Sequence, residues 1–260
     1  MPDRTLPRDP APLRITVVVP ALDEAQRLPR CLASLAAQTR PPDEVVVVDN
    51  GSADATADLA AAAGARVVHE PRRGIWPAAA TGYDAATGDV IARVDADSVL
   101  PPGWLARVDE LLRDDPSTGA VTGPGRFRGM RLVPRHLAHL LYMQTYFRLG
   151  ALAVGGTPVF GSAFAMRASA WRAARSSVHR DHDVHDDLDL SFHLEPGSVR
   201  YDDALAVSIS ARPFRSPAGL VLRLARGWRS VVLHWPQQAP WVPVRERVRA
   251  RLARVVGRAG

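Results

Sequence analysis

The sequence predicts an α/β fold in which a mostly parallel central sheet is flanked by helices. Between residues 15 and 97, short runs rich in Val and Ile alternate with Ala-rich stretches of helical character. The runs are continuously apolar, which is typical of strands buried on both faces of a parallel sheet. With 260 residues, 47% of them hydrophobic, the chain is long enough to bury such a core.

The expected elements follow one another along the chain. The expected strands are ITVVVP, EVVVVDN, ARVVHE and DVIARVDAD, separated by helices in EAQRLPRCLASLAAQ, ADATADLAAAAG and WPAAATGYDAATG. In PPGWLARVDELLRDD a proline stands at the helix start and apolar residues recur at helical spacing. We further expect a helix in HLAHLLYMQTYFRL and a returning strand at residues 199–209, VRYDDALAVSI.

The carboxyl-terminal segment is strongly basic, although the whole chain carries a net charge of only +6. Its spacing predicts amphipathic helices in LVLRLARGWRSVVLHW and VRERVRARLARVVG. In the first of these, the apolar face holds Leu220, Leu224, Trp228, Val231 and Val232, with Arg223, Arg226 and Arg229 turned away from its centre. The apolar face packs on the domain or lies on an anionic membrane or a partner. No recognisable nucleic-acid motif accompanies the basic residues, so nucleic acid is not an expected partner.

Other features bear on compartment. The Pro-rich, charged residues 1–13 lack the apolar core of a signal peptide, and we expect a flexible lead-in there. The uncharged stretch 149–166 is interrupted by glycines and a proline, so a membrane-spanning helix is not expected. The single cysteine, Cys31, has the spacing of a core residue. A bacterial, cytoplasmic protein is expected, with peripheral contact at the inner face of the membrane still open; the absence of lysine indicates GC-biased coding.

Acidic residues follow several of the predicted strands. Glu24 comes shortly after the first strand, Asp49 ends the second, and Asp95 and Asp97 follow the fourth. In a parallel sheet these carboxyl ends meet at one edge, where the ligand crevice lies. Clustered carboxylates repel one another unless they share cations or polar ligands. The pattern predicts a ligand site at this edge.

Five segments resemble the inverting family 2 glycosyltransferases of the GT-A fold. They are VVVPALDE, VVVDNGSADAT, GDVIARVDADS, GSAFAMRASAW and HDDLDLSFHL, in the family's order and spacing. The resemblance covers residues 14–213 and implies a nucleotide-sugar-binding half at 14–98 and an acceptor half at 99–213, followed by the basic helical extension at 214–260. It implies a metal-assisted hexosyltransferase with Mg²⁺ or Mn²⁺, a nucleotide sugar such as a UDP- or GDP-hexose, and a hydroxyl acceptor whose identity the sequence does not give.

The resemblance also implies roles on the donor side. Asp97 is the implied metal ligand, and Asp95 contacts the ribose, or the metal through water. Asp49 is implied to read the base and Glu24 the ribose. Arg73, just before Gly74, either reaches a diphosphate or is a solvated arginine in a turn. The implied donor-binding residues are Pro20, Ala21, Leu22, Glu24, Asp49, Arg73, Asp95 and Ala96.

On the acceptor side, Asp187 matches the family's catalytic base, which takes the proton of the attacking hydroxyl. Asp186 stands where the family usually has Glu, and Gly161, Ser162 and His193 are weaker acceptor-side candidates. The acidic residues also suit a helix N-terminus, where the helix dipole favours negative charge, and both roles are compatible. Two departures from the family pattern are Ala80 in place of Asn and His193 in place of Arg.

Histidines recur at positions 179, 182 and 185, but neither a cysteine nor an HExxH pattern accompanies them, so zinc is not expected from this spacing. A single histidine, His185 or His193, remains a candidate to complete the Asp97 metal shell.

Two other functions stay open, a nucleotidyltransferase of similar fold and a catalytically silent nucleotide-sugar-binding protein. The first needs a glycine-rich basic loop after the first strand, which PALDEAQR does not supply, and the second does not require Asp187.

Overall fold

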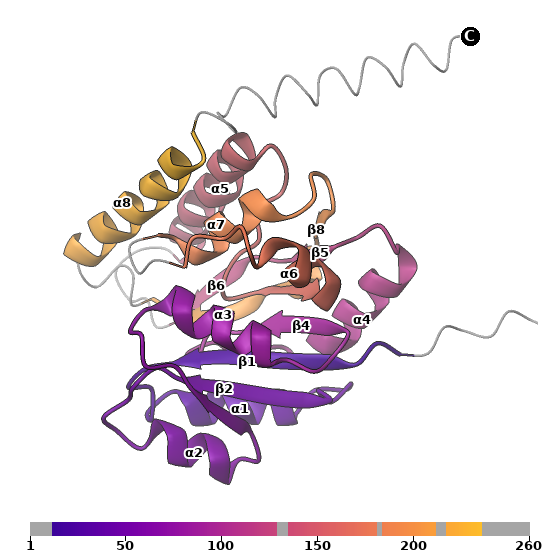
Figure 1. Cartoon of the computed structure of the whole chain (residues 1–260), viewed down its shortest axis with the longest axis vertical. Helices are drawn as coiled ribbons and strands as arrows, with labels where there is room; N and C mark the ends of the chain where they lie inside the picture. Colours follow the sequence, from indigo (N-terminus) through magenta and orange to yellow (C-terminus); the bar gives the residue numbers. More distant parts are fainter. Residues whose placement is uncertain (1–11, 129–134, 181–183, 212–216, 236–260) are drawn as a thin grey trace, which may run out of the picture.

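A seven-stranded sheet forms the centre of the protein in this computed structural model, which describes residues 12–128, 135–180, 184–211 and 217–235 (Figure 1). The strand order is β3-β2-β1-β4-β7-β5-β8, and β7 alone runs antiparallel to its neighbours β4 and β5. The predicted fold class, α/β with a mostly parallel sheet, is confirmed. The strands are β1 (Ile15–Ala21), β2 (Glu44–Asp49), β3 (Arg66–His69), β4 (Val90–Arg93), β5 (Ala120–Thr122), β7 (Phe164–Arg167) and β8 (Val199–Tyr201).

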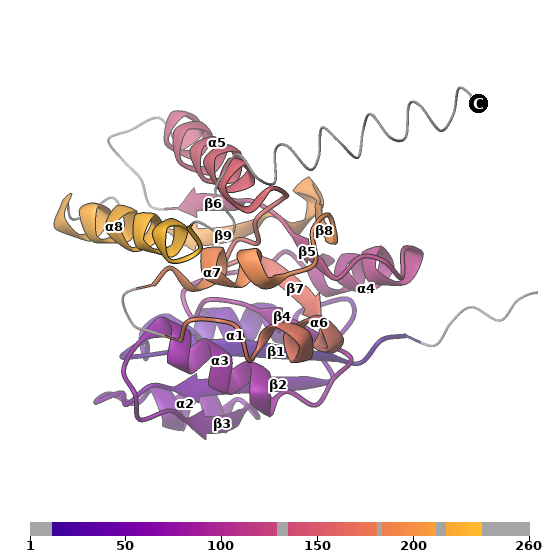
Figure 2. The same cartoon turned by 45° about the horizontal axis from the view of Figure 1, so that its top comes forward.

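Helices cover both faces of this sheet (Figures 1 and 2). Side chains of β1 alternate between two apolar clusters, with Val17 and Val19 in one and Val18 in the other. The first cluster also receives α1 and α4, and the second receives α3 and α6. The helices are α1 (Leu28–Ala36), α2 (Thr56–Ala62), α3 (Ile75–Ala85), α4 (Trp104–Asp114), α5 (Arg135–Val154), α6 (Ala168–Ala174), α7 (Asp186–His193) and α8 (Pro217–Leu233).

Cys31 lies in the core, as its spacing predicts. The residue is fully buried on α1, and burial raises the pKa of its thiol to about 12. A thiol with so high a pKa stays protonated at neutral pH and is a poor nucleophile. Cys31 therefore acts as a small apolar side chain.

The expected single strand at residues 199–209 is wrong. The structure breaks it into β8, in the large sheet, and β9 (Val207–Ser210), which pairs in parallel with β6 (Gly125–Arg128) in a separate two-stranded sheet. A 3₁₀ turn, Asp203–Leu205, lies between them. The Asp202 carboxylate accepts a 2.7 Å hydrogen bond from the Ala204 N–H, and this local cap competes successfully with continuation of the strand.

The uncharged stretch 149–166 is divided between the end of α5, a loop and the start of β7. Within the described ranges, no helix combines the length and the apolar character needed to cross a membrane.

Helix α8 packs against α7 (Figure 2), and several of its apolar side chains are exposed. Leu224 and Trp228 are 66% and 67% exposed, whereas Ser230 is fully buried. The second predicted basic helix, residues 244–257, and most of the lead-in at 1–13 lie outside the described residues.

Candidate functional site

A cavity of about 520 Å³ lies beyond the carboxyl ends of β1, β2 and β4. Its lining comes from segments far apart in the chain: the strand ends, the loop after β4, the loop before β7, α5, the start of α7, and α8. The sequence-predicted residues in the lining are Pro20, Ala21, Leu22, Glu24, Asp95, Ala96, Asp97, Gly161, Ser162, Asp186 and Asp187. The structure thus brings the two predicted halves together around one space.

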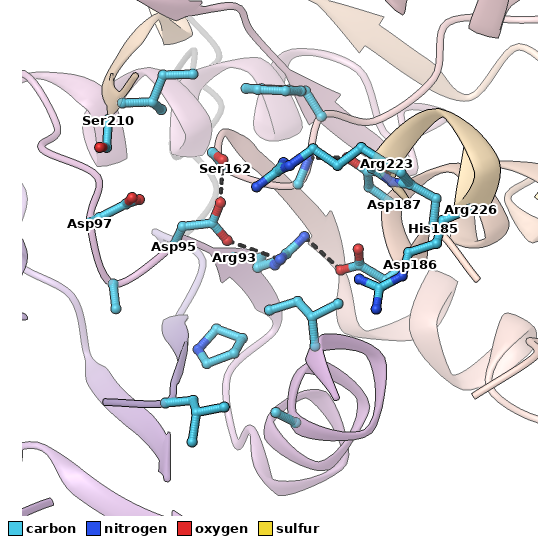
Figure 3. Close-up of a pocket in the computed structure, with 18 of the residues that line it drawn as sticks. Arg93, Asp95, Asp97, Ser162, His185, Asp186, Asp187, Ser210, Arg223 and Arg226 are labelled. Atoms are coloured by element: carbon cyan, nitrogen blue, oxygen red, sulfur yellow. Dashed lines mark hydrogen bonds and ion pairs between the residues drawn. The ribbon is translucent and has the colours of Figure 1, made fainter. Parts of the chain in front are cut away.

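Asp95 and Asp97 lie on one side of the cavity (Figure 3). Strand β4 ends at Arg93, so both aspartates stand in the turn that follows it, two and four residues beyond the strand. Asp95 Oδ1 lies 2.9 Å from Arg93 Nη2, and Asp95 Oδ2 accepts a hydrogen bond from the Ser162 hydroxyl. Asp95 is therefore held in place by protein groups on both of its oxygens.

Arg93 joins the two sides of the cavity. Its side chain is only 3% exposed, and its Nη1 lies 2.8 Å from Asp186 Oδ2 while Nη2 pairs with Asp95 (Figure 3). Burial lowers the pKa of Arg93, but the neighbouring carboxylates outweigh burial and raise it. A permanent positive charge therefore sits among the acidic residues and limits their mutual repulsion.

Asp186 and Asp187 begin α7 on the other side of the cavity. Burial raises the pKa of Asp186, although Arg93 opposes the shift. Burial also raises the pKa of Asp187, but the charge and hydrogen bond of His185, 2.6 Å away at Nδ1, outweigh it and lower the pKa. Adjacent carboxyl groups whose pKa values are pushed apart are typical of acid–base sites.

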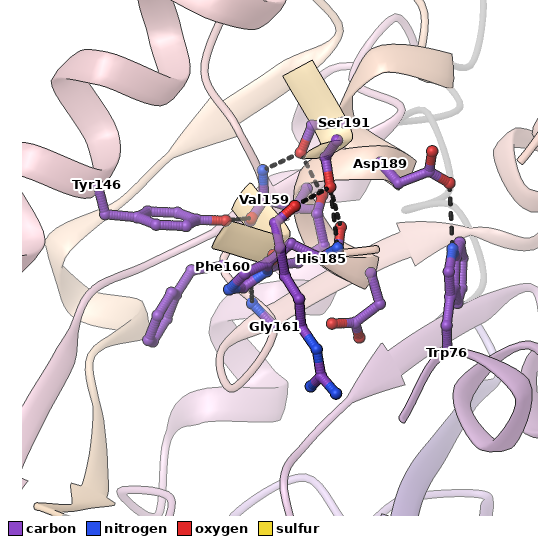
Figure 4. Close-up of polar contacts among 12 residues, drawn as sticks. Trp76, Tyr146, Val159, Phe160, Gly161, His185, Asp189 and Ser191 are labelled. Carbon is purple, nitrogen blue, oxygen red and sulfur yellow. Dashed lines mark hydrogen bonds and ion pairs between the residues drawn. The ribbon is translucent and has the colours of Figure 1, made fainter. Parts of the chain in front are cut away.

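The start of α7 is fixed by the segment that precedes β7 (Figure 4). The Gly161 N–H donates to Asp187 Oδ2 at 2.7 Å, and the Val159 N–H donates to the Ser191 hydroxyl at 3.0 Å. Glycine is required at position 161, because a Cβ there would overlap the Arg93 guanidinium. The direction of the Asp187 carboxylate is thus set by the backbone N–H of Gly161, a residue whose lack of a Cβ leaves room for Arg93.

Helix α8 adds positive charge to the cavity. Arg223 and Arg226 line it, and Arg226 Nε is buried without a hydrogen-bond partner among the described residues (Figure 3). A buried guanidinium N–H of this kind is costly unless an acceptor arrives from a ligand. The cavity thus presents carboxylates on its two sides and arginines from α8.

Three sequence-predicted site residues lie outside the lining. Asp49 is buried beside the cavity and accepts a 3.2 Å bond from the Ser52 N–H; its neighbour Asn50 lines the cavity instead. Arg73 donates to the Gly51 carbonyl at 3.1 Å. His193 faces His234, with their Nε2 atoms 3.1 Å apart.

Sequence reasoning missed Arg93, Asn50 and the two α8 arginines as cavity residues. Arg93 carries a usable signal, since an arginine inside the otherwise apolar run VIAR needs a buried anionic partner. Asn50 bridges the loop after β3, donating to the Glu70 carbonyl at 2.8 Å and accepting from the Gly74 N–H at 2.8 Å. No local signal in the sequence places α8 over the cavity, because that contact spans the whole fold.

Asp97 and Asp95 line the cavity as the residues for which the sequence implies contact with a divalent cation. Carboxylate oxygens are the ligands that Mg²⁺ and Mn²⁺ prefer. His185, Asp186 and Asp187 also bring ligand atoms within 4.8 Å of one another. In that group Arg93 pairs with Asp186 and His185 pairs with Asp187. Asp95 is likewise engaged, by Arg93 and Ser162, so these contacts do not decide between the two groups.

The model of the family "Glycosyl transferase family 2" matches residues 16–173. An uncharacterised glycosyltransferase of Mycobacterium tuberculosis is 42% identical over 112 residues, which cover 43% of this chain and 49% of that protein. The chain thus spans about half the length of these curated relatives.

Solved structures share the fold. A mannosyltransferase of Pyrobaculum calidifontis, in complex with GDP-Man and Mn²⁺, aligns with a TM-score of 0.64 and 24% identity, covering 87% of this chain and 66% of that one. Glucosyl-3-phosphoglycerate synthase of M. tuberculosis, in complex with Mn²⁺, UDP and glucosyl-3-phosphoglycerate, aligns with a TM-score of 0.60 and 23% identity, covering 85% and 79%.

Proposed function

Because the chain belongs to glycosyl transferase family 2, we propose that it transfers a hexose from a nucleotide-diphosphate sugar to a hydroxyl acceptor, with inversion at the anomeric carbon. The observation that carries this proposal is the cavity in which Asp95 and Asp97 face Asp186 and Asp187 across the buried Arg93. Similar structures bind GDP-Man and UDP with Mn²⁺, which supports a nucleotide sugar as the donor.

The donor occupies the side of the cavity formed by the ends of β1 and β4. Pro20, Ala21 and Leu22 border the nucleotide, and Glu24 is our candidate for the ribose. Asp97, with help from Asp95, would hold Mg²⁺ or Mn²⁺, and such a cation would supply positive charge to balance the leaving diphosphate. Asp49 and Arg73 each directly precede a lining residue, Asn50 and Gly74, and we keep them as candidates for the base and the diphosphate.

Asp187 acts on the acceptor. The acceptor oxygen bonds to the anomeric carbon as the bond to the diphosphate breaks, and the hydroxyl proton passes to the Asp187 carboxylate. The lowered pKa of Asp187 keeps it ionised and able to accept this proton at neutral pH. A positioned base of this kind is worth roughly 100-fold to 10,000-fold in rate.

The α8 arginines complement anionic groups in the cavity. Arg223 and Arg226 reach it from the side opposite the strand ends (Figure 3). Guanidinium groups suit phosphate oxygens because they present several N–H donors in one plane. We therefore place a phosphate, from the donor or from the acceptor, within reach of these side chains.

A second proposal concerns the surface of α8. Its outward stripe of Val221, Leu224, Trp228 and Val232 is exposed, while Arg223 and Arg226 face the cavity. Exposed apolar residues beside arginines are typical of helices that lie on anionic membranes. We propose that residues 214–260, of which the structure describes 217–235, contact such a membrane.

The proposed reaction is tested with the purified chain, Mn²⁺ or Mg²⁺, and a panel of UDP-, GDP- and dTDP-sugars. Donor binding is followed as a rise in melting temperature, because a ligand that binds the native state stabilises it by mass action. Asp187→Asn should keep the metal-dependent thermal shift and lose at least about 100-fold in transfer, whereas Asp97→Asn should lose the shift.

Asp114→Asn, an exposed acid on α4, serves as the matched control and should behave as the wild type. Identical behaviour of the Asp187 and Asp97 variants would contradict the assigned roles. Donor binding without hydrolysis or transfer, even with cell-extract acceptors present, would favour a silent nucleotide-sugar-binding protein.

A further inference from the structure

A second cluster of polar side chains lies outside the cavity, between the loop after α6, helix α7 and the residue that follows α8. It consists of His179, Asp189, His193 and His234. One ligand atom from each, Nδ1 of His179, Oδ1 of Asp189 and Nε2 of His193 and His234, lies within 4.8 Å of the others. No step of the proposed reaction uses these residues.

The separations of these atoms match those of a tetrahedral metal shell. His179 Nδ1 is 2.8 Å from Asp189 Oδ1, and His193 Nε2 is 3.1 Å from His234 Nε2. Asp189 Oδ1 is 3.5 Å from His234 Nε2 and 3.9 Å from His193 Nε2. Ligands that surround Zn²⁺ tetrahedrally at roughly 2.0–2.1 Å stand about 3.3 Å apart, which is the middle of this range.

The hydrogen bonds around the cluster orient its lone pairs inward. His234 Nδ1 lies 2.6 Å from the Ser230 carbonyl oxygen, so Nδ1 carries a proton and Nε2 presents a lone pair when the ring is neutral. Asp189 Oδ2 accepts bonds from Trp76 Nε1 at 3.1 Å and from the His179 N–H at 2.9 Å, which leaves Oδ1 for the cluster (Figure 4). Outer contacts of this kind are typical of metal ligands.

Burial keeps most of the cluster away from solvent. The Asp189 side chain is fully buried, and those of His234 and His193 are 4% and 14% exposed. Asp189 Oδ1 and the neutral His234 Nε2 are both acceptors, and they face each other at 3.5 Å. Protons on His179 Nδ1 and His193 Nε2 would satisfy both acceptors through these hydrogen bonds, and a metal ion bound by all four residues would replace those two protons.

We propose that His179, Asp189, His193 and His234 form a structural Zn²⁺ site. Three imidazoles and one carboxylate are ligands that zinc takes, and four protein ligands leave no open position for chemistry. Of the histidines whose spacing was weighed at the sequence level, only His179 belongs to it; His185 pairs with Asp187, and His182 lies outside the described residues. The site is separate from the proposed Mg²⁺ or Mn²⁺ site at Asp97.

The zinc ion would fasten α8 to α7. His234 directly follows α8, while Asp189 and His193 belong to α7, which also carries Asp186 and Asp187. Because α8 contributes Arg223 and Arg226 to the cavity, the metal fixes the position of these arginines relative to the proposed base. The site therefore has a structural effect on the cavity without contacting a substrate.

The test measures metal in the full-length protein, purified without a histidine tag and exposed to Zn²⁺. Elemental analysis after desalting should find stoichiometric zinc, and replacement by Co²⁺ should give the intense visible absorption of a tetrahedral site. His193→Asn and His234→Asn should each lose the bound zinc and the cobalt spectrum. His185→Asn and Asp97→Asn should retain both, because these residues belong to the cavity.

Wild-type protein that binds no stoichiometric zinc, or that binds Co²⁺ only with the weak spectrum of octahedral coordination, would overturn the proposal in favour of a metal-free, hydrogen-bonded cluster. This result does not depend on whether the variants fold. Retention of zinc by folded His193→Asn and His234→Asn would overturn it equally. Donor binding and transfer are measured separately, so failure of the glycosyltransferase proposal is distinguishable.

Discussion

Arg93 is the side chain on which the charge balance of the cavity depends. It is almost fully buried and contacts one carboxylate on each side, Asp95 and Asp186. The buried Asp186 carboxylate could not stay ionised at low cost without it, because burial raises the pKa of this group. The arginine therefore connects the donor side and the acceptor side of the cavity electrostatically.

Substitution Arg93→Met should destabilise the protein by about 3 to 5 kcal/mol at neutral pH, since it leaves the buried Asp186 carboxylate without its counter-charge. Loss of Arg93 raises the pKa of Asp186 in the folded state further above its unfolded value. The penalty is therefore greatest at neutral pH and shrinks as the pH falls toward the unfolded pKa and the carboxyl becomes protonated. Urea denaturation followed by circular dichroism at several pH values measures both effects.

Arg107→Met is the matched control. Arg107 also pairs with two carboxylates, Glu110 and Asp202, but its side chain is 31% exposed. Exposed ion pairs contribute roughly 0 to 1 kcal/mol, so this variant should lose much less stability. Equal losses in the two variants, or a loss for Arg93→Met that does not change with pH, would contradict the role given to Arg93.

At the scale of elements, Glu44 connects the amino-terminal ends of neighbouring strands. It begins β2 and accepts hydrogen bonds from Thr16 on β1, from Arg66 on β3 and from Thr87 before β4. Partial burial raises the pKa of the Glu44 carboxyl, but these hydrogen bonds outweigh it and lower the pKa to about 2. The ionised carboxylate therefore stabilises this end of the sheet.

The stabilisation from Glu44 has a defined pH dependence. Because the pKa is lower in the folded state than in the unfolded state, the contribution is complete above the unfolded value of 4.5 and is lost as the pH falls toward about 2. Glu44→Gln should therefore lower the melting temperature at pH 7, and the gap to wild type should close near pH 2. Glu195→Gln, at an exposed position, should show no such gap; a gap that persists unchanged at low pH would count against this account.

The elements also show how far the sequence predicts the fold and the site. Parallel strands place their carboxyl ends together, so Glu24, Asp95 and Asp97 could be assigned to one cavity from their positions alone. The break between β8 and β9 was missed because it depends on a side-chain cap at Asp202, which competes locally with the strand. Helical spacing predicted α8 itself, but it did not predict that the arginines of α8 line the cavity.

At the scale of the whole molecule, α8 relates the cavity to the outer surface. One side of the helix contributes Arg223 and Arg226 to the cavity, and the other side exposes Leu224 and Trp228. A membrane bound to the outer side would lie close to the cavity that we assign to the reaction. This arrangement would suit an acceptor that is itself held at a membrane surface.

The membrane contact is best tested by substitution, because truncation of α8 would also remove the cavity arginines. The double variant Leu224→Ser, Trp228→Ser removes two exposed apolar side chains, each of which gains roughly 1.5–3 kcal/mol when fully buried. Because these two side chains would be only partly buried in the membrane interface, their removal should lower the affinity for anionic vesicles by about tenfold or more. Co-sedimentation with phosphatidylglycerol vesicles measures this affinity, with pure phosphatidylcholine vesicles as the control for charge. Membrane contact through α8 would be contradicted if the full-length protein did not bind the anionic vesicles at physiological salt. It would also be contradicted if the double variant bound them as tightly as wild type.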